Sequence, residues 1–187
     1  MDAQLTHAGN RFDVPGGGVL YCCSEIEGCY RETLARLRVS PAMRQLDEDN
    51  DNQYMRAGCI PSSWRESRRI FSFRIPGALP FLDVEAQSTM TVLDAVLAPR
   101  PDPIDVAAVR GGDRLLTREI ALWAYVQVDG DGDPLYGGIR YFSRVGNFAC
   151  WAIFAETYLE EVDPPRGIGL SDPALVRTAR EFGLTLN

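Results

Sequence analysis

A chain of 187 residues is long enough for one domain with a hydrophobic core and short for two. With 45% hydrophobic and 24% charged residues it is typical of a soluble globular protein, and no apolar run approaches the roughly 20 residues that cross a bilayer. The net charge of −7 argues against a general nucleic-acid binder, which normally has a basic face.

Strands and helices are both predicted along the chain. After ten polar residues without periodicity, the N-terminal half predicts a turn at 15–18, a short buried strand at 19–23, a helix at 25–38, a solvated acidic loop at 46–53, and strands at 69–75 and 79–84. The C-terminal half predicts a helix at 88–98, a proline-rich connector at 99–105, a helix at 115–127, a turn at 129–134, strands at 138–142 and 150–154, and a last helix and closing strand from residue 174. The sequence contains no repeat and no domain boundary, so we expect one domain over residues 1–187.

The helix predicted at 25–38 has the clearest start signal. Ser24 is a candidate N-cap, and Glu27 three residues later completes a capping-box pattern. The helix is expected to end before Pro41. Helical spacing predicts an apolar side made of Ile26, Tyr30, Thr33, Leu34 and Leu37.

Arginine and cysteine usage narrows the chemistry. All 19 basic residues are arginine, which excludes lysine nucleophiles and favours bidentate recognition of phosphate or carboxylate; a GC-rich coding sequence explains the bias equally well. Adjacent Cys22 and Cys23 should point to opposite faces of a strand, which makes them a poor disulfide or metal pair. An odd count of five cysteines and no signal peptide predict a cytoplasmic protein.

A small set of polar and aromatic residues suits a site for a nicotinamide dinucleotide. A guanidinium can hold a phosphate, an aromatic ring can stack, a carboxylate can face a positive charge and a hydroxyl can fix orientation. The set consists of Arg11, Tyr21 and Glu32, at intervals of ten and eleven residues, and of Ser143 between Arg140 and Arg144.

Each of these residues also has an ordinary structural interpretation. Arg11 is otherwise a surface arginine, Tyr21 a core ring and Ser143 a polar loop residue. Glu32 lies on the apolar-patterned side of its predicted helix, where a carboxylate needs a partner or a catalytic role. An ion pair with Arg36, four residues on, is the ordinary alternative.

Several competing motifs fail. Residues 129–140 open like a calcium loop, but Pro134 occupies the glycine position and Arg140 the position of the bidentate glutamate. The glycines at 16–18 fit neither a P-loop nor a dinucleotide fingerprint. A zinc site or a Ser-His-Asp triad would depend on the lone histidine, His7, so we expect no metal.

Several stretches together resemble the RES-domain family, named for an arginine, a glutamate and a serine. The stretches are NRFDVPGGGVLYCCSEIEGCYRETLARLR at 10–38, LTREIALWAYVQ at 116–127 and YGGIRYFSRVGNFACWAIF at 136–154, while ALVRTAREFGLTL at 174–186 fits less specifically. Members of this family include the toxins of bacterial Xre–RES toxin–antitoxin pairs. The resemblance puts Arg11, Glu32 and Ser143 in the three naming roles and Tyr21 in that of the active-site tyrosine.

The resemblance implies a fold and a reaction. The implied fold is α+β, with a mixed or split sheet and flanking helices, similar to NAD-dependent ADP-ribosyltransferases. The implied enzyme uses NAD as substrate and cleaves its nicotinamide–ribose bond by hydrolysis, or by phosphorolysis with inorganic phosphate. An ADP-ribosyltransferase that modifies a protein and an inactive interaction domain are the two alternatives.

The resemblance also implies a role for each residue. Glu32 would stabilise positive charge on the ribose, Tyr21 would stack on the nicotinamide or its ribose, and Ser143 would hydrogen-bond the ribose or the amide. Arg11 would bind the pyrophosphate, and Arg140 or Arg144 would assist it or bind inorganic phosphate.

Family members usually carry a further arginine on a strand before the segment 10–12, where this chain has only MDAQLTHAGN. Either the N-terminus is truncated or the site works without that group. The implied partner is a protein antitoxin of helix-turn-helix type, for which an acidic surface suits a basic partner. We expect no direct nucleic-acid or membrane contact, and a homodimer stays open.

Overall fold

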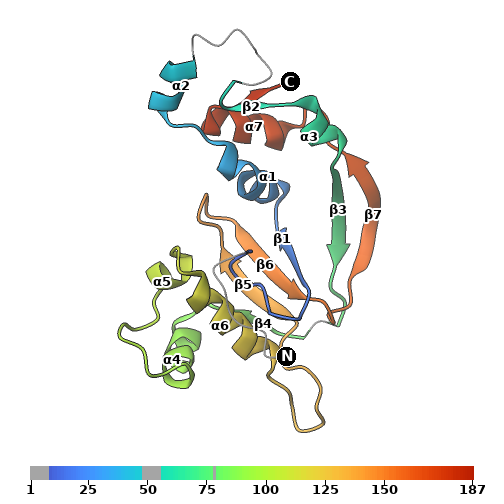
Figure 1. Ribbon diagram of the computed structural model, residues 1–187. Coiled ribbons are helices and arrows are strands. Elements are labelled where there is room, and N and C mark those ends of the chain that lie inside the picture. Colours follow the sequence, from blue (N-terminus) through green and yellow to red (C-terminus); the bar gives the residue numbers. More distant parts are fainter. Residues whose placement is uncertain (1–8, 48–55, 78) are drawn as a thin grey trace. The chain divides into compact units, whose positions relative to one another are not determined.

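The computed structural model describes residues 9–47, 56–77 and 79–187 (Figure 1). The chain divides into two compact units, each made of two separate segments. The first unit comprises residues 1–24 and 75–159, and the second comprises 25–74 and 160–187. One domain over 1–187 stays a prediction. His7 and most of the loop predicted at 46–53 lie outside the described residues.

The first unit is built on a mixed four-stranded sheet in the order β1–β6–β5–β4. Its strands are β1 (Val19–Cys23), β4 (Phe81–Asp83), β5 (Gly138–Phe142) and β6 (Ala149–Phe154). β4 is parallel to β5, whereas β6 is antiparallel to both β5 and β1. β1, β4 and β5 therefore run in the same direction, and their carboxyl ends lie at one edge of the sheet.

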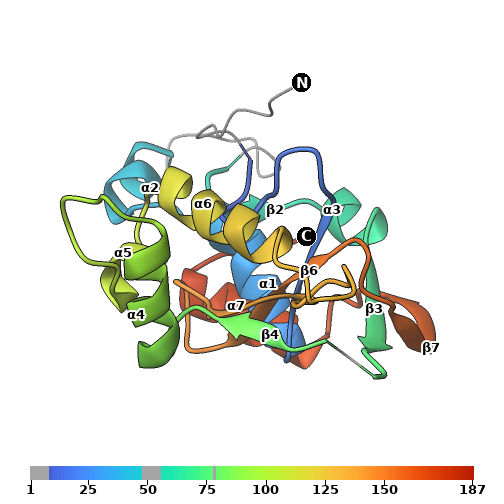
Figure 2. The ribbon, with the colours of Figure 1, turned by 90° about the horizontal axis from the view of Figure 1, so that it is seen from below.

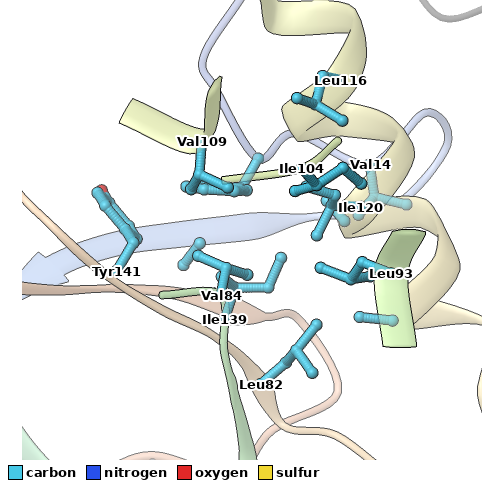
Figure 3. Packing of buried hydrophobic residues seen from close by; sticks show 14 of the residues in the cluster. Val14, Leu82, Val84, Leu93, Ile104, Val109, Leu116, Ile120, Ile139 and Tyr141 are labelled. Atoms are coloured by element: carbon cyan, nitrogen blue, oxygen red, sulfur yellow. The ribbon is translucent and has the colours of Figure 1, made fainter. Parts of the chain in front are cut away.

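Three helices cover one face of this sheet: α4 (Gln87–Val96), α5 (Val106–Arg110) and α6 (Arg114–Tyr125) (Figures 1 and 2). The hydrophobic core lies between them and the sheet. Figure 3 shows Val84 and Ile139 from the sheet side facing Leu93 of α4 and Ile120 of α6, all buried. Because successive side chains of a strand alternate, the core face of β5 carries Ile139 and Tyr141.

Aspartate side chains start two of these helices. Asp105 accepts a hydrogen bond from the backbone N–H of Ala108, and Asp113 accepts from Leu115 and Leu116. These bonds satisfy N–H groups that have no partner inside the helix.

The second unit combines helices with two separate two-stranded sheets. Its elements are α1 (Ile26–Leu34), the 3-10 helix η1 (Ala35–Leu37), α2 (Pro41–Asp47), β2 (Cys59–Ile60), α3 (Ser62–Glu66), β3 (Arg69–Arg74), β7 (Glu160–Gly167), α7 (Pro173–Phe182) and β8 (Thr185–Leu186). β2 pairs with β8 in parallel, β3 pairs with β7 in antiparallel, and α1 packs against α7.

Local chemistry explains both ends of α7. The Asp172 side chain accepts from the N–H groups of Ala174 and Leu175, with Pro173 in the first turn. Gly183 ends the helix at φ 63°, a left-handed conformation that favours glycine.

Three predictions about the N-terminal elements are wrong. The capping box is absent, because Glu25 rather than Ser24 is the N-cap of α1 and makes no side-chain cap bond, while Ser24 Oγ accepts from the Trp151 indole. The α-helix ends at Leu34 and continues only as η1, so it is shorter than 25–38. The strand at 19–23 exists but is an edge strand, with Leu20 44% exposed, rather than a buried one.

The observed elements confirm an α+β protein with mixed sheets and helices, as the resemblance implied. The specific likeness to ADP-ribosyltransferases stays a prediction. Within the described ranges, no helix has the length and apolar character needed to cross a bilayer.

Candidate functional site

Arg11 lies in the loop that leads to β1 and is half-buried between aromatic rings. Its Nη2 donates to the carbonyl oxygen of Val109, at the end of α5, over 2.6 Å. The guanidinium carbon is 5.1 Å from the centroid of Phe12 and 5.0 Å from that of Tyr141. Cation–π contacts of this kind hold a guanidinium in one place. Arg11 is therefore not a solvated surface residue.

Tyr21 points to the core face from the middle of β1. Its hydroxyl donates to Asp13 Oδ1 over 2.9 Å and accepts from the backbone N–H of Phe12 over 2.9 Å. Burial, followed by the hydrogen bond to Asp13 and the charge of that carboxylate, raises the pKa of Tyr21 well above its ordinary value. Tyr21 is therefore a neutral residue whose hydroxyl is engaged with the loop that carries Arg11.

Ser143 follows β5 directly and is 1% exposed. Its backbone N–H donates to the carbonyl of Phe148 over 2.9 Å, and its Oγ accepts from the N–H of Val145 over 3.0 Å. These bonds form the turn between β5 and β6. By strand alternation, Ser143 continues the face of Tyr141, the residue on which Arg11 stacks. The first unit thus brings Arg11, Tyr21 and Ser143 to the same face of its sheet.

The two arginines that flank Ser143 have different surroundings. Arg140 belongs to the opposite face of β5, forms an ion pair with Asp83 and lies 4.8 Å from the centroid of Phe142. Arg144 is exposed, and its Nη1 donates to the carbonyl of Gly111 over 3.3 Å. Of the two, Arg144 therefore has the more accessible guanidinium.

Glu32 belongs to α1 in the second unit. It is exposed, whereas Gly28, Tyr30 and Leu34 form the buried side of that helix. The expectation that Glu32 lies on the apolar side is thus wrong. It forms no hydrogen bond or ion pair with any described residue, so the alternative pair with Arg36 is not made. Its carboxylate is open to solvent.

Comparison with known families gives one match. The sequence model described as "RES domain" matches residues 1–171, most of the chain. The chain belongs to the RES domain family. Curated proteins gave no match, and neither did solved structures. All four residues that the resemblance singled out lie inside the matched range of this RES domain.

The structure of this RES domain adds an acidic group that sequence reasoning missed. Glu85, just after β4, accepts from both Arg110 nitrogens Nε and Nη2, over 3.1 and 2.6 Å, and from the N–H of Phe142 over 2.9 Å. Burial acts to raise the pKa of Glu85, but these hydrogen bonds, with the charges of Arg110 and Arg11, hold it below the usual value. The available signal was a carboxylate directly after a predicted strand.

α5 connects these groups, although the sequence did not predict it. Three successive residues at its C-terminal end contact the site: Val109 accepts from Arg11, Arg110 pairs with Glu85, and Gly111 accepts from Arg144. The carboxyl edge of the sheet in the RES domain therefore carries arginines together with the carboxylates of Asp83 and Glu85. The arginines of this edge can bind the oxygens of an anionic ligand, and a carboxylate can face a positive charge on the same ligand.

The aspartate loop at 129–133 is stabilised by hydrogen bonds within the loop. Asp129 Oδ1 accepts from the N–H groups of Asp131 and Asp133, over 2.9 and 3.0 Å. Such bonds are typical of an Asx turn. Among the described residues, no group of three or more His, Cys, Asp or Glu side chains is placed to hold a metal ion.

Proposed function

We propose that this protein degrades NAD by cleaving the bond between nicotinamide and ribose, with water or inorganic phosphate as acceptor. The observation that carries the proposal is the environment of Arg11, which we assign to the naming arginine of the RES domain. It is stacked on Tyr141, on the same face as Ser143. Membership of the family over residues 1–171 supports the same reaction.

The reaction breaks one bond and forms one. The C–N bond to nicotinamide breaks, and its electron pair leaves with the ring, which becomes neutral. Positive charge grows on the ribose until an oxygen of water or phosphate bonds to the same carbon, and water then gives up a proton. A carboxylate near the ribose stabilises this charge more in the transition state than in bound NAD.

We assign that carboxylate to Glu32, since it matches the family's glutamate. Its exposure supports the assignment, because a solvent-accessible carboxylate without a partner among the described residues is available to a substrate. It can also orient the attacking water or phosphate.

Arg11 is assigned to the pyrophosphate of NAD. A planar guanidinium on two rings offers donors in fixed directions, which suits a bidentate contact with phosphate oxygens. For inorganic phosphate, the accessible Arg144 is the better candidate than Arg140, which is paired with Asp83. Ser143 is buried, and we assign it to the turn and to a hydrogen bond with the ribose or the amide.

A protein antitoxin of helix-turn-helix type is the partner we propose, on the basis of the family. The net charge of −7 supports a basic contact surface on that partner. We also propose that the protein is cytoplasmic. The proposal leaves open whether it forms a homodimer.

The test is NAD consumption by purified protein, with and without phosphate, followed by chromatography. ADP-ribose would show hydrolysis, and ADP-ribose 1″-phosphate formed only with phosphate would show phosphorolysis. Label from NAD kept on a protein would show a transferase. Intact NAD under all conditions would contradict the proposal and favour an inactive interaction domain.

The matched variants are Glu32→Gln and Glu66→Gln. Both residues are exposed carboxylates of the second unit. Glu32→Gln should lower kcat by about 100-fold or more with an unchanged melting temperature. Glu66→Gln should leave kcat unchanged. Near-wild-type kcat in Glu32→Gln would show that Glu32 is not the carboxylate of the reaction.

A further inference from the structure

The loop that carries Arg11 is held by a buried group on α6. Arg118 is 6% exposed, which is rare for a charged side chain without several partners. Its Nε donates to the carbonyl of Asn10 over 3.1 Å, and its Nη2 donates to Asp13 Oδ2 over 3.3 Å. Arg118 therefore contacts the residue before Arg11 and a residue shortly after it.

Asp13 extends this contact to the backbone. Its Oδ2 accepts from the N–H of Asn10 over 2.7 Å, and its Oδ1 accepts from the Tyr21 hydroxyl over 2.9 Å. The Tyr21 oxygen in turn accepts from the N–H of Phe12 over 2.9 Å. Both backbone neighbours of Arg11, Asn10 and Phe12, are thus fixed by side chains.

Gly9 shows how closely these groups pack. It has φ +85°, a region that L side chains rarely adopt. A Cβ built there would clash with Arg118 Nη2 and lie 2.5 Å from Asp13 Oδ2. The loop therefore approaches the pair of charges at a residue with no side chain.

We propose that Arg118, Asp13 and Tyr21, called here the loop clamp, position Arg11 for its contact with the dinucleotide. This inference rests on the proposed function for the role of Arg11, and concerns residues to which that function assigns no such task. A guanidinium already held in its binding geometry loses less freedom when the substrate binds. The clamp residues act through Arg11 and are positioning residues.

The inference changes the expected role of Tyr21. Its hydroxyl donates to Asp13 and accepts from Phe12, so Tyr21 affects NAD through the conformation of the loop rather than by stacking on the nicotinamide. Tyr21→Phe keeps the ring and removes both bonds, which separates these two roles. Stacking predicts full activity in Tyr21→Phe, whereas positioning predicts a loss.

The first test does not need activity. Hydrogen exchange of backbone amides in the full-length protein should be slow at Asn10 and Phe12. Tyr21→Phe should speed exchange at Phe12 by about 10-fold or more and leave Asn10 slow, whereas Asp13→Ala should speed both. Asp13→Asn, which keeps an acceptor oxygen, should restore part of the protection. Unchanged exchange at Phe12 in Tyr21→Phe and Asp13→Ala would overturn the clamp.

The second test uses a double-mutant cycle in NAD consumption. Tyr21→Phe should raise KM for NAD about 5- to 10-fold, and should have no further effect in an Arg11→Ala background, because both changes act through Arg11. Equal effects of Tyr21→Phe in both backgrounds, or a wild-type KM, would overturn positioning. The matched control is Tyr125→Phe, which also removes a tyrosine–carboxylate bond in the first unit, that to Glu156. It should leave KM and exchange at Phe12 unchanged.

The two tests separate the two proposals. If the wild-type protein leaves NAD intact, the proposed function fails, while hydrogen exchange still decides whether the clamp holds the loop. If NAD is consumed and exchange does not respond, the function stands and the clamp is wrong.

Discussion

The guanidinium carbon of Arg11 lies 5.0 Å from the ring centroid of Tyr141, although the two residues are far apart in the sequence. Tyr141 lies on the core face of β5, which ends at Phe142, and Ser143 is the next residue. The contact therefore fixes the position of Arg11 against the strand that leads to Ser143. A planar cation held against a ring keeps its donors in fixed directions.

This contact predicts that lysine cannot replace Arg11. Arg11→Lys keeps the charge but lacks the planar fork and the stacking surface. We expect kcat/KM for NAD to fall about 10- to 100-fold with little change in melting temperature. Arg100→Lys, an arginine of the same unit that pairs with Glu119, is the control and should keep wild-type kcat/KM. Full activity of Arg11→Lys would contradict a bidentate role.

Glu85 predicts a stability that depends on pH. Its pKa is depressed in the folded protein, so its contribution is complete above the unfolded value of about 4.3 and is lost as pH falls through the folded pKa. Glu85→Ala should cost roughly 2–4 kcal/mol at pH 7, because the Arg110 guanidinium and the Phe142 N–H lose their acceptor.

Urea unfolding between pH 3 and pH 7 checks this prediction. The wild-type free energy of unfolding should fall more steeply below pH 4.5 than that of Glu85→Gln, which has no charge to lose at this position. Identical pH dependence in the two proteins would mean that the ion pair contributes nothing to stability.

Elements with strong periodicity were predictable from the sequence. The helix at 115–127 appears as α6 over Arg114–Tyr125, and the strands at 138–142 and 150–154 appear as β5 and β6. Each has an apolar face that repeats at its own period, so local pattern and burial agree. The absent capping box shows where this agreement ends, because Ser24 Oγ accepts from Trp151, a residue that no local pattern relates to it.

Short or unusual elements were not predictable. β7 contains Pro164 and Pro165, which argue against a strand. Within the described part of the chain it belongs to a two-stranded sheet with β3, and the free edge of such a sheet tolerates proline. α5 has five residues, too few for a helical period to be recognised.

The candidate site was likewise predictable only in part. The resemblance singled out Arg11, whereas the structure shows which groups hold the loop that carries it. Arg118 and Asp13 are 105 residues apart, so their pairing depends on the packing of α6 rather than on any local signal. The exposure of Glu32, by contrast, was readable from helical spacing. At about 100° per residue it lies roughly 120° from Ile26 and roughly 160° from Leu34, so placing it on the apolar side was an error.

Cys23 and Cys150 provide a chemical test of strand register. They are partners across β1 and β6, and their Sγ atoms are 3.2 Å apart. Ser24 N–H donates to Ala149, so the cysteines occupy the neighbouring non-hydrogen-bonded pair, where side chains approach most closely. A small disulfide oxidant should react first with half-buried Cys23, after which buried Cys150 displaces the oxidant's second thiol.

Mass spectrometry after such oxidation should find one linkage, Cys23 to Cys150, with three of the five thiols still free. Cys22→Ser should retain the linkage, because Cys22 points to the other face, and Cys150→Ser should abolish it. A linkage between Cys22 and Cys150 would place β1 in a register shifted by one residue.

Gly138 should be the most sensitive position of the central strand β5. Its φ is 153°, and a Cβ there would clash with the carbonyl oxygen of Ala152 and lie 2.9 Å from the Cα of Ile153, both backbone atoms of β6. Backbone atoms of a paired strand cannot move aside without breaking the ladder between β5 and β6. Gly138→Ala should therefore cost at least about 3 kcal/mol in the free energy of unfolding, measured with urea.

Gly132→Ala, also at positive φ but with open space around its Cβ, is the control for backbone strain alone. Since strain costs about 1 kcal/mol, equal losses in the two variants would show that the close approach of β6 to Gly138 has no effect on stability.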